Sequence, residues 1–569
     1  MNDHKNLILA VVLSALVLLG WSWAANRFFP TANPPSSKIV AGKQQPLPQP
    51  QPAPQASGAT TPKKLQTISA ALQSSPRVSI RTPSLLGSIN LKGAQFDDLL
   101  LLKEKQTLAA NSPPVRLLSP IGSPGGYIAA FGWTGQQGQT PTLDTLWTSD
   151  SPVLSPGHPV TLSTQTANGT RYQIKIAVDD NYLFTIQQSV TNASGAPLDV
   201  RPIGLVSRAA QSADRSMWTN HVGPIGVLDG KANYDVNWKD LDQGKAETFN
   251  DTGWLGFTDK YWLTALVPQA SASSEFRKSP SGGYQADYAL APASLAPGQT
   301  LTTQSRLFAG VKEKDLLDGY QAAGVPDFSF AIDWGWFHWF MIPIFDLLLF
   351  LFHTLGNFGV AIIALTFIVR AIMFPVAQKQ FQSMAAMRKL QPKMKALQER
   401  FKDDKQRQQQ EIMKLYQEEK VNPAAGCLPI VLQIPVFYAL YKVLLVSVEM
   451  RHQPFVLWIK DLSAPDPLTP VNLFGLLHFT PPTMLAIGVL PILVGATQFV
   501  SMKLNPQPMD PAQAQVFAIM PWVLVFIMAP FAAGLQLYWI TNNLLTMAQQ
   551  WHLYRKFGLH LKDTHPVQT

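Results

Sequence analysis

The chain alternates between long uncharged apolar runs and stretches with a polar or alternating pattern. One apolar run, Leu7 to Ala25, lies near the N-terminus and is just long enough to span a membrane. Five more spans are expected in the C-terminal half, at residues 347–375, 427–448, 483–502, 516–529 and 531–551. The pattern predicts a polytopic α-helical membrane protein with six spans. Residues 1–29 would be an anchor, 346–376 the second span and 426–557 spans three to six.

The N-terminal run has a second interpretation, a cleaved signal peptide. We favour an uncleaved anchor because the run of 19 residues is longer than the apolar region of most signal peptides. Trp21 and Trp23 also stand at its far end, where aromatic residues mark a membrane interface.

Between the first two spans the hydrophobic pattern changes to a period of two. Apolar residues occupy alternate positions from Tyr172 to Val178 and again from Tyr182 to Ile186, with two aspartates and an asparagine between them. Such alternation around a turn cluster predicts a β-hairpin. Similar pieces recur elsewhere, so residues 76–325 are expected to form one large β-sandwich domain on the trans side of the membrane.

Two segments flank this domain. Residues 30–75 are rich in proline and glutamine, a composition typical of an extended, solvated linker. Residues 326–345 are rich in aromatic side chains and predict an interfacial aromatic helix or belt, with a core aromatic cluster as the alternative. The aromatic residues concerned are Trp334, Trp336, Phe337, Trp339 and Phe340.

Residues 377–425 carry a pattern of their own. Apolar residues recur at intervals of three and four from Met384 to Phe401, Asp403-Asp404 predicts a reversal, and Asn422-Pro423 ends a second helix. The pattern predicts a two-helix hairpin with a coiled-coil-like seam. This pattern is equally compatible with two roles. The hairpin could be a solvated structural element, or a docking arm for a ribosome, a nascent chain or lipid head groups.

The charge pattern orients these elements. The net charge is +9 and only 14% of residues are charged, which favours membrane spans and an anionic lipid surface over nucleic-acid recognition. Residues 377–420 contain eleven Lys or Arg and six acids, whereas 449–482 contain only two basic residues. The positive-inside rule therefore places the hairpin, the N-terminus and the tail at 558–569 in the cytoplasm.

Motifs for common enzyme chemistry are absent from the sequence. No GxxxxGK[ST], HExxH or GxSxG motif occurs, and the one cysteine, Cys427, cannot form a thiolate cluster. We therefore expect no catalysis, no metal and no cofactor. The protein would have to use binding energy or a gradient.

Arg370 is the principal candidate functional residue. It ends an uncharged run, and Thr366 lies four residues earlier on the same helical face. A charge within a membrane costs about 2.5–3.5 kcal/mol, so Arg370 either snorkels to the surface or occupies a hydrated place in the bundle. The spans also contain amide side chains, including Gln433 and Gln536. A simpler role for them than a functional one is hydrogen bonding between helices. Lys442 lies close enough to the trans end of its span to snorkel, and we assign it no function.

Four segments resemble the YidC/Oxa/Alb family of membrane protein insertases. They are Thr366 to Pro375, Ser383 to Pro392, Val421 to Phe437 and Gly534 to Asn543. The anchor, linker and β domain resemble the Gram-negative form of the family, whose periplasmic domain is a β-supersandwich. The resemblance implies a location in the bacterial inner membrane.

The resemblance also implies a function and partners. Five spans would enclose a hydrophilic groove lined by Arg370, Thr366, Gln433, Gln536 and the pair Tyr538-Trp539, where the family often carries two tyrosines. The groove would receive polar parts of nascent membrane proteins, alone or with the Sec translocon, and the ribosome and anionic lipids would be further partners. Two alternatives stay open: a secondary transporter binding an anion at Arg370, and a tethered sugar-binding or mutarotase-like module.

Overall fold

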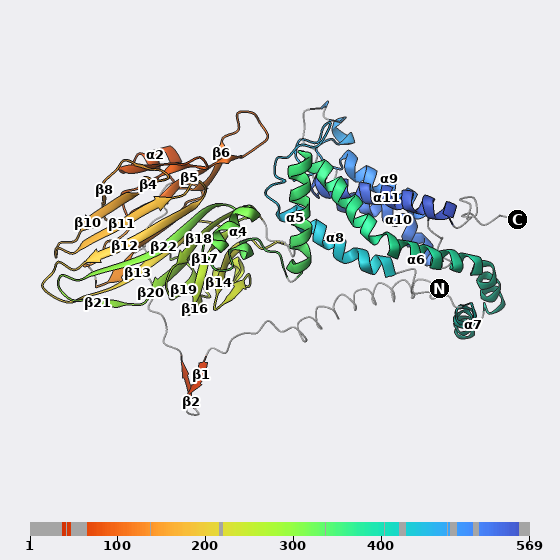
Figure 1. Ribbon diagram of the computed structural model, residues 1–569, viewed down its shortest axis with the longest axis horizontal. Coiled ribbons are helices and arrows are strands. Elements are labelled where there is room, and N and C mark those ends of the chain that lie inside the picture. Colours follow the sequence, from red (N-terminus) through yellow and green to blue (C-terminus); the bar gives the residue numbers. More distant parts are fainter. Residues whose placement is uncertain are drawn as a thin grey trace.

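The computed structural model describes residues 37–40, 43–46, 65–136, 138–214, 220–280, 282–335, 337–402, 404–419, 428–474, 476–477, 486–504 and 511–556. The predicted anchor, most of the predicted linker and the C-terminal tail lie outside these residues. Two parts follow one another along the chain, a β domain and a helical region (Figure 1).

The β domain is a sandwich of two sheets. Among the described residues, one sheet has nine strands in the order β15 (Lys231–Asn233), β14 (Gly223–Leu228), β17 (Thr252–Thr258), β18 (Trp262–Pro268), β22 (Thr300–Val311), β12 (Leu183–Thr191), β11 (Arg171–Val178), β10 (Val160–Gln165) and β8 (Thr148–Ser149). The other has eleven, in the order β16 (Glu247–Phe249), β19 (Ala272–Lys278), β20 (Tyr284–Leu290), β13 (Leu198–Arg208), β7 (Tyr127–Gly135), β5 (Gln95–Lys105), β4 (Leu85–Asn90), β3 (Arg77–Arg81) and β9 (Val153–Leu154), with β21 (Ala293–Leu295) on β13 and β6 (Pro114–Leu118) on β5.

The predicted hairpin is confirmed. Strands β11 and β12 pair antiparallel, with Ile176 opposite Ile186 and Val178 opposite Phe184. The alternate residues that the sequence assigns to one face are buried in the core between the sheets. Gln188 of β12 is also buried, and its amide donates to the carbonyl of Gly132 on the facing sheet at 2.7 Å. The period of two thus decides the core face, and this amide ties the two sheets together.

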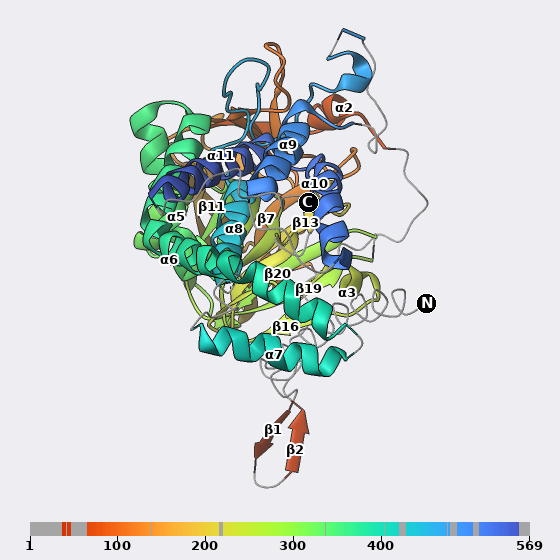
Figure 2. The same cartoon turned by 90° about the vertical axis from the view of Figure 1, so that its right-hand side faces the viewer.

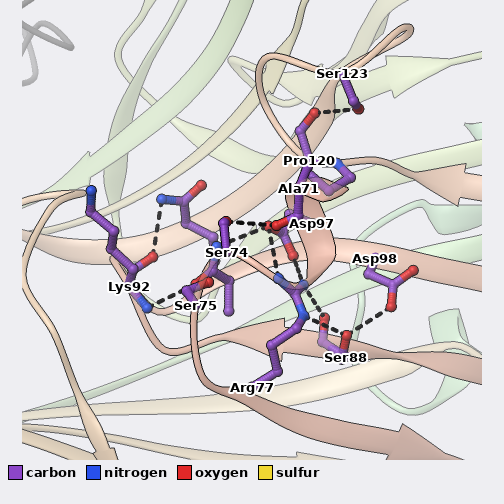
Figure 3. A network of polar contacts seen from close by, with 12 residues as sticks. Ala71, Ser74, Ser75, Arg77, Ser88, Lys92, Asp97, Asp98, Pro120 and Ser123 are labelled. Carbon is purple, nitrogen blue, oxygen red and sulfur yellow. Dashed lines mark hydrogen bonds and ion pairs between the residues drawn. The ribbon is translucent and has the colours of Figure 1, made fainter. Parts of the chain in front are cut away.

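A polar network joins three neighbouring strands of the eleven-stranded sheet (Figure 3). Arg77 of β3 forms an ion pair with Asp97 of β5 and donates from Nε to the hydroxyl of Ser88 at 2.7 Å. Ser88 in turn donates to Asp98 at 2.7 Å. Burial raises the pKa of Asp97, and Arg77 acts in the opposite direction. Each of these polar groups has a partner, which is what burial requires.

Short helices border the β domain. They are α2 (Ile68–Leu72), α3 (Trp238–Asp242), α4 (Lys314–Ala322) and the 3-10 turn η1 (Phe328–Ala331). Within the predicted linker, β1 (Ser37–Val40) and β2 (Lys43–Pro46) pair antiparallel.

The helical region contains α5 (His338–Leu355), α6 (Phe358–Arg400), α7 (Lys405–Glu418), α8 (Leu428–Val446), α9 (Val489–Leu504), α10 (Pro511–Met528) and α11 (Ala533–Lys556), with the turn η3 (Pro470–Asn472) before α9. Helix α11 packs against α6 and α9, α10 packs against α9, and α5 packs against α6 and α8. Viewed from the helical end, α10 lies beyond α9 at one side and α5 and α6 lie at the other (Figure 2).

The predicted run from 347 to 375 is two helices rather than one. Gly356, with a φ of 69°, ends α5, and Asn357 begins α6 by accepting a hydrogen bond from the backbone of Val360 at 3.1 Å. A glycine at the C-terminal cap and an asparagine at the N-terminal cap both favour such a break. Pro375 does not close the segment, because α6 continues through it to Arg400.

The aromatic segment before α5 is also divided. It comprises η1, an irregular stretch and the first turns of α5. Trp334 is buried and donates to the carbonyl of Ser329 at 3.3 Å, so it belongs to the core, whereas Trp339 is 64% exposed. The core alternative holds for Trp334, whereas the interfacial position of Trp339 stays a prediction.

By length and composition, α5 and residues Phe358–Lys379 of α6 could cross a membrane. Helices α8, α9 and α10 contain shorter apolar stretches, Ile434–Val446, Val489–Leu504 and Gln515–Met528. Helix α11 has 24 residues, but its amides and threonines make it far less apolar. It is the helix that contributes most polar groups to the site.

Candidate functional site

Arg370 lies on α6 and is joined to α11. Its Nε donates to the side-chain oxygen of Asn542 at 2.7 Å, and one terminal nitrogen donates to the Asn542 carbonyl at 3.5 Å. Gln549, two turns further along α11, donates to the carbonyl of Arg370 at 3.4 Å. Arg370 is half-buried. Among the residues that the structure describes, no carboxylate forms an ion pair with it, so its positive charge has only neutral partners.

Two more contacts extend this polar region from α11 to α9. Asn543 donates to the hydroxyl of Thr497 at 3.1 Å, and the indole N–H of Trp539 donates to Gln498 at 3.3 Å. We call the set formed by these contacts and those of Arg370 the polar seam. Its residues are Arg370, Thr497, Gln498, Trp539, Asn542, Asn543 and Gln549.

Trp539 and Tyr538 belong to an aromatic cluster with α8. The ring of Phe437 lies edge-on to Trp539, with centroids 4.9 Å apart, and 6.4 Å from Tyr538. Tyr538 is buried, whereas Trp539 is half-buried. Although Trp539 has no phenolic hydroxyl, its N–H still makes a polar contact, with Gln498.

Two predicted site residues bond elsewhere. Thr366 is buried, and its hydroxyl donates to the carbonyl of Ile362 in its own helix at 2.7 Å. Gln536 is buried, and its amide donates to the carbonyls of Met528 and Phe531, both at 2.8 Å. Gln536 therefore braces the turn between α10 and α11. Gln433 lies on α8, and its side chain is outside the described part of the chain.

Replacing Gln536 by methionine tests this bracing role. The variant removes the amide that donates to the carbonyls of Met528, which is buried, and Phe531, which is half-buried, and we expect a free energy of unfolding lower by about 1–3 kcal/mol. Thermal unfolding in detergent measures the loss. The insertion activity that the family resemblance predicts should, well below the melting temperature, stay near that of the unsubstituted protein. A loss of activity with unchanged stability would instead place Gln536 in contact with substrate.

The side chain of Lys442 does not extend to the protein surface, as snorkelling would require, but is buried in an ion pair. Its ammonium lies 3.0 Å from a carboxylate oxygen of Asp333, and its side chain is 3% exposed. The second oxygen of Asp333 accepts from the backbone N–H of His221, in the β domain, at 3.0 Å. The sequence could not pair Lys442 with Asp333, because 109 residues separate them.

Further ion pairs join the β domain to the helices at the same end. Lys314 of α4 lies 2.8 Å from Asp346 of α5. Arg451, after α8, lies 2.9 Å from Glu104 of β5 and stacks over the ring of Trp262. We call these contacts and the Lys442–Asp333 pair the interdomain joint. It connects three points of the helical region to the β domain.

The second half of α6 and α7 pack antiparallel. Lys393 lies 2.6 Å from Glu419, and Gln408 donates to the carbonyl of Gln398 at 2.9 Å. Asp404 caps α7 by accepting from the backbone N–H of Arg407 at 3.0 Å. A shallow cleft between the two helices is lined by Lys393, Ala396, Leu397, Arg400, Glu411, Lys414, Leu415 and Glu418.

The polar seam is not accompanied by a candidate metal site within the described residues. Over the described residues, no group of three or more His, Cys, Asp or Glu side chains could hold a metal ion. The arrangement of the seam is suited to binding: a cation with neutral partners can receive an anionic or strongly polar group.

Comparisons with known proteins cover both parts. The family model of the YidC periplasmic domain matches residues 77–347, and that of the 60Kd inner membrane protein matches 350–560. The membrane protein insertase YidC of Zymomonas mobilis subsp. mobilis is 46% identical, with 98% of this chain and 96% of that protein covered. The membrane protein insertase YidC of Methylorubrum extorquens is 42% identical, with 99% of this chain and 96% of that protein covered. A crystal structure of an active YidC insertase, 20% identical, covers 84% of this chain and 92% of its own, with a TM-score of 0.37.

Proposed function

Because this chain belongs to the YidC family of membrane protein insertases, we propose that the polar seam is where it receives the polar flank of an entering protein. The chain is a membrane protein insertase with a periplasmic domain. Nothing in the comparisons supports a small-anion carrier. The observation that carries the proposal is the half-buried guanidinium of Arg370, whose described side-chain partner is the amide of Asn542.

The membrane arrangement that we propose has six spans. The first is the N-terminal run, and the other five, the insertase core, are the first half of α6 and helices α8, α9, α10 and α11. Helix α5 would lie at the periplasmic interface, since it runs across the direction of α6 (Figure 1) and exposes Trp339 and Phe350. Both termini would be cytoplasmic.

The length of α6 supports a cytoplasmic hairpin. Its 43 residues correspond to about 65 Å, roughly twice the thickness of the hydrocarbon core. Since α6 begins beside the β domain, its second half and α7 would leave the bilayer on the opposite side. The eleven basic residues of 377–420 suit a cytoplasmic position. There the hairpin would meet anionic lipids and the ribosome, and the Sec translocon would be a further partner.

Insertion would then proceed as the substrate leaves water, with its polar flank bound at the seam and its apolar segment entering lipid. Arg370 and the seam amides would hold the polar flank while the apolar segment moves along the outward faces of α8 and α10 into lipid. The exposed face of α10, which carries Val516, Ile519, Trp522 and Phe526, suits this path. Each Leu or Ile that enters lipid contributes about 0.3–0.6 kcal/mol, so a substrate helix gains several kcal/mol without ATP.

Water access to the seam tests the proposal. Thr546 lies on α11 between Asn542 and Gln549, both of which contact Arg370. In a Cys427→Ser background, we expect Thr546→Cys to react with a membrane-impermeant maleimide added from the cytoplasmic side. The matched control is Ile519→Cys on α10, which is 59% exposed on the face assigned to lipid and should stay unlabelled. Equal inertness of the two positions would mean a dry bundle and would sink the groove mechanism.

A further inference from the structure

The connection between α8 and α9 closes the end of the helical region that faces the β domain. Its backbone bonds to the start of α6 and to the turn before α11. Asn357 donates to the carbonyl of Phe455 at 3.2 Å, and the backbone N–H groups of Ala533 and Gly534 donate to Ala464 and Leu462 at 2.8 and 2.9 Å. The connection is therefore held in place at the periplasmic ends of several helices.

This connection buries polar side chains. Asp466 is 5% exposed and accepts hydrogen bonds from the indole of Trp458 at 3.0 Å and from the backbone of Leu468 and Leu490. Thr469 and Asn472 are also buried. Loops in water usually do the reverse, placing such residues outside.

The same connection exposes bulky apolar side chains. Leu457 is 76% and Leu476 77% exposed, and Val456, Val471, Leu473, Phe474 and Leu477 are exposed as well. We call these seven residues the apolar foot. Leu457, Leu473 and Phe474 have φ values of 55°, 50° and 57°, which bulky residues rarely adopt.

Hydrogen bonds hold this strained backbone in place. The N–H of Phe474 donates to the carbonyl of Thr469 at 2.8 Å, and that of Leu477 donates to Asn472 at 3.0 Å. Strain that the surroundings maintain in this way is characteristic of functional segments. The backbone here keeps Leu457, Leu473 and Phe474 exposed, although in water their burial would be favoured.

Charge and length indicate what covers the foot. No Asp, Glu, Lys or Arg occurs between Asp466 and Lys503. Helix α9 has 16 residues, about 24 Å, which is less than the roughly 30 Å of a hydrocarbon core. The connection that carries the foot lies beside the N-terminus of α9, because the backbone N–H of Val489 donates to the carbonyl of Leu468 at 3.1 Å, and the foot would complete the distance. The chemistry that suits an uncharged, outward apolar surface at this level is a lipid acyl chain.

We propose that the apolar foot is embedded in the periplasmic leaflet of the membrane and is covered by lipid acyl chains. The foot would fix the depth of α8 and α9, and with them the height of the polar seam. The inference rests on the membrane placement of these helices and not on the groove.

Fluorescence quenching in proteoliposomes tests this. In the full chain with Cys427→Ser, a single Leu476→Cys is labelled with an environment-sensitive fluorophore. The control is Leu146→Cys, 60% exposed in the β domain. We expect a spin label on the upper acyl chain of the lipid to quench the Leu476→Cys label several-fold more than aqueous iodide does, and the control to behave in the opposite way.

Two results would overturn the proposal. Quenching of the Leu476→Cys label mainly by iodide would show that the foot is in water. Protection from both quenchers would show that protein covers it, as a partner docked there would. Leu457→Cys, at the other end of the foot, repeats the measurement at a second site. Because the readout is quenching and not insertion, it is independent of the outcome for the polar seam.

Discussion

Arg370→Ala should reduce insertion of a single-span substrate with an acidic flank by roughly tenfold to a hundredfold. A hydrogen bond to a charged group contributes about 1.5–3 kcal/mol, and each 1.4 kcal/mol corresponds to a factor of ten. The guanidinium bonds to Asn542 through Nε and one terminal nitrogen. The remaining N–H donors would bind a carboxylate. Protease protection of the substrate in proteoliposomes, normalised to the amount of protein, measures the effect.

Three controls separate charge from packing. A substrate with the same apolar segment and a neutral flank should be much less sensitive to Arg370→Ala. Arg370→Lys retains the charge but loses the planar fork, so it should be intermediate. Asn542→Ala removes the partner and one seam amide but retains the charge, so insertion should fall much less than with Arg370→Ala. If Asn542→Ala were as damaging as Arg370→Ala, the arginine would act by holding α6 against α11, and the substrate contact would be refuted.

Lys442→Met should lower the free energy of unfolding by about 3–5 kcal/mol, the usual cost of removing one partner of a buried ion pair. The carboxylate of Asp333 would be left buried with only the N–H of His221 to bond. A lysine that merely snorkelled to the surface would be replaced at little cost. The apparent melting temperature of the purified protein in detergent, followed by tryptophan fluorescence, measures the change.

The double variant Asp333→Asn with Lys442→Met is the matched control. It has no buried charge at this position, and the asparagine oxygen can still accept from His221. We therefore expect it to recover most of the stability that Lys442→Met loses. A double variant as unstable as the single one would mean that Lys442 stabilises the protein by its packing and not by its charge.

Local pattern was sufficient for much of the fold. The alternation from Tyr172 to Ile186 determines both the hairpin and its buried face, because a strand places every second side chain on the same side. It was insufficient at Gly356-Asn357, where apolar residues on both sides obscure the break between α5 and α6. The capping preferences of glycine and asparagine are the signal that could have located it.

The structure places five of the six predicted site residues, among them Tyr538, which is buried beside Phe437. Arg370 and Trp539 belong to the polar seam, whereas Thr366 bonds within its own helix and Gln536 braces a turn. Asn542 is visible in the sequence as a polar residue within a span, but its pairing with Arg370 is not, since 172 residues separate the two.

By itself, the sequence determined that a β-rich domain precedes a region of apolar helices, which face of the β-hairpin is buried, and that Arg370 lies in an apolar setting. Only the tertiary structure decided the partner of each buried charge and the polarity of the loop after α8. The physical reason is the distance along the chain over which each kind of interaction acts. Periodicity acts between neighbours along the chain, whereas Lys442 finds Asp333, and Leu476 its exposed position, only when distant elements have packed.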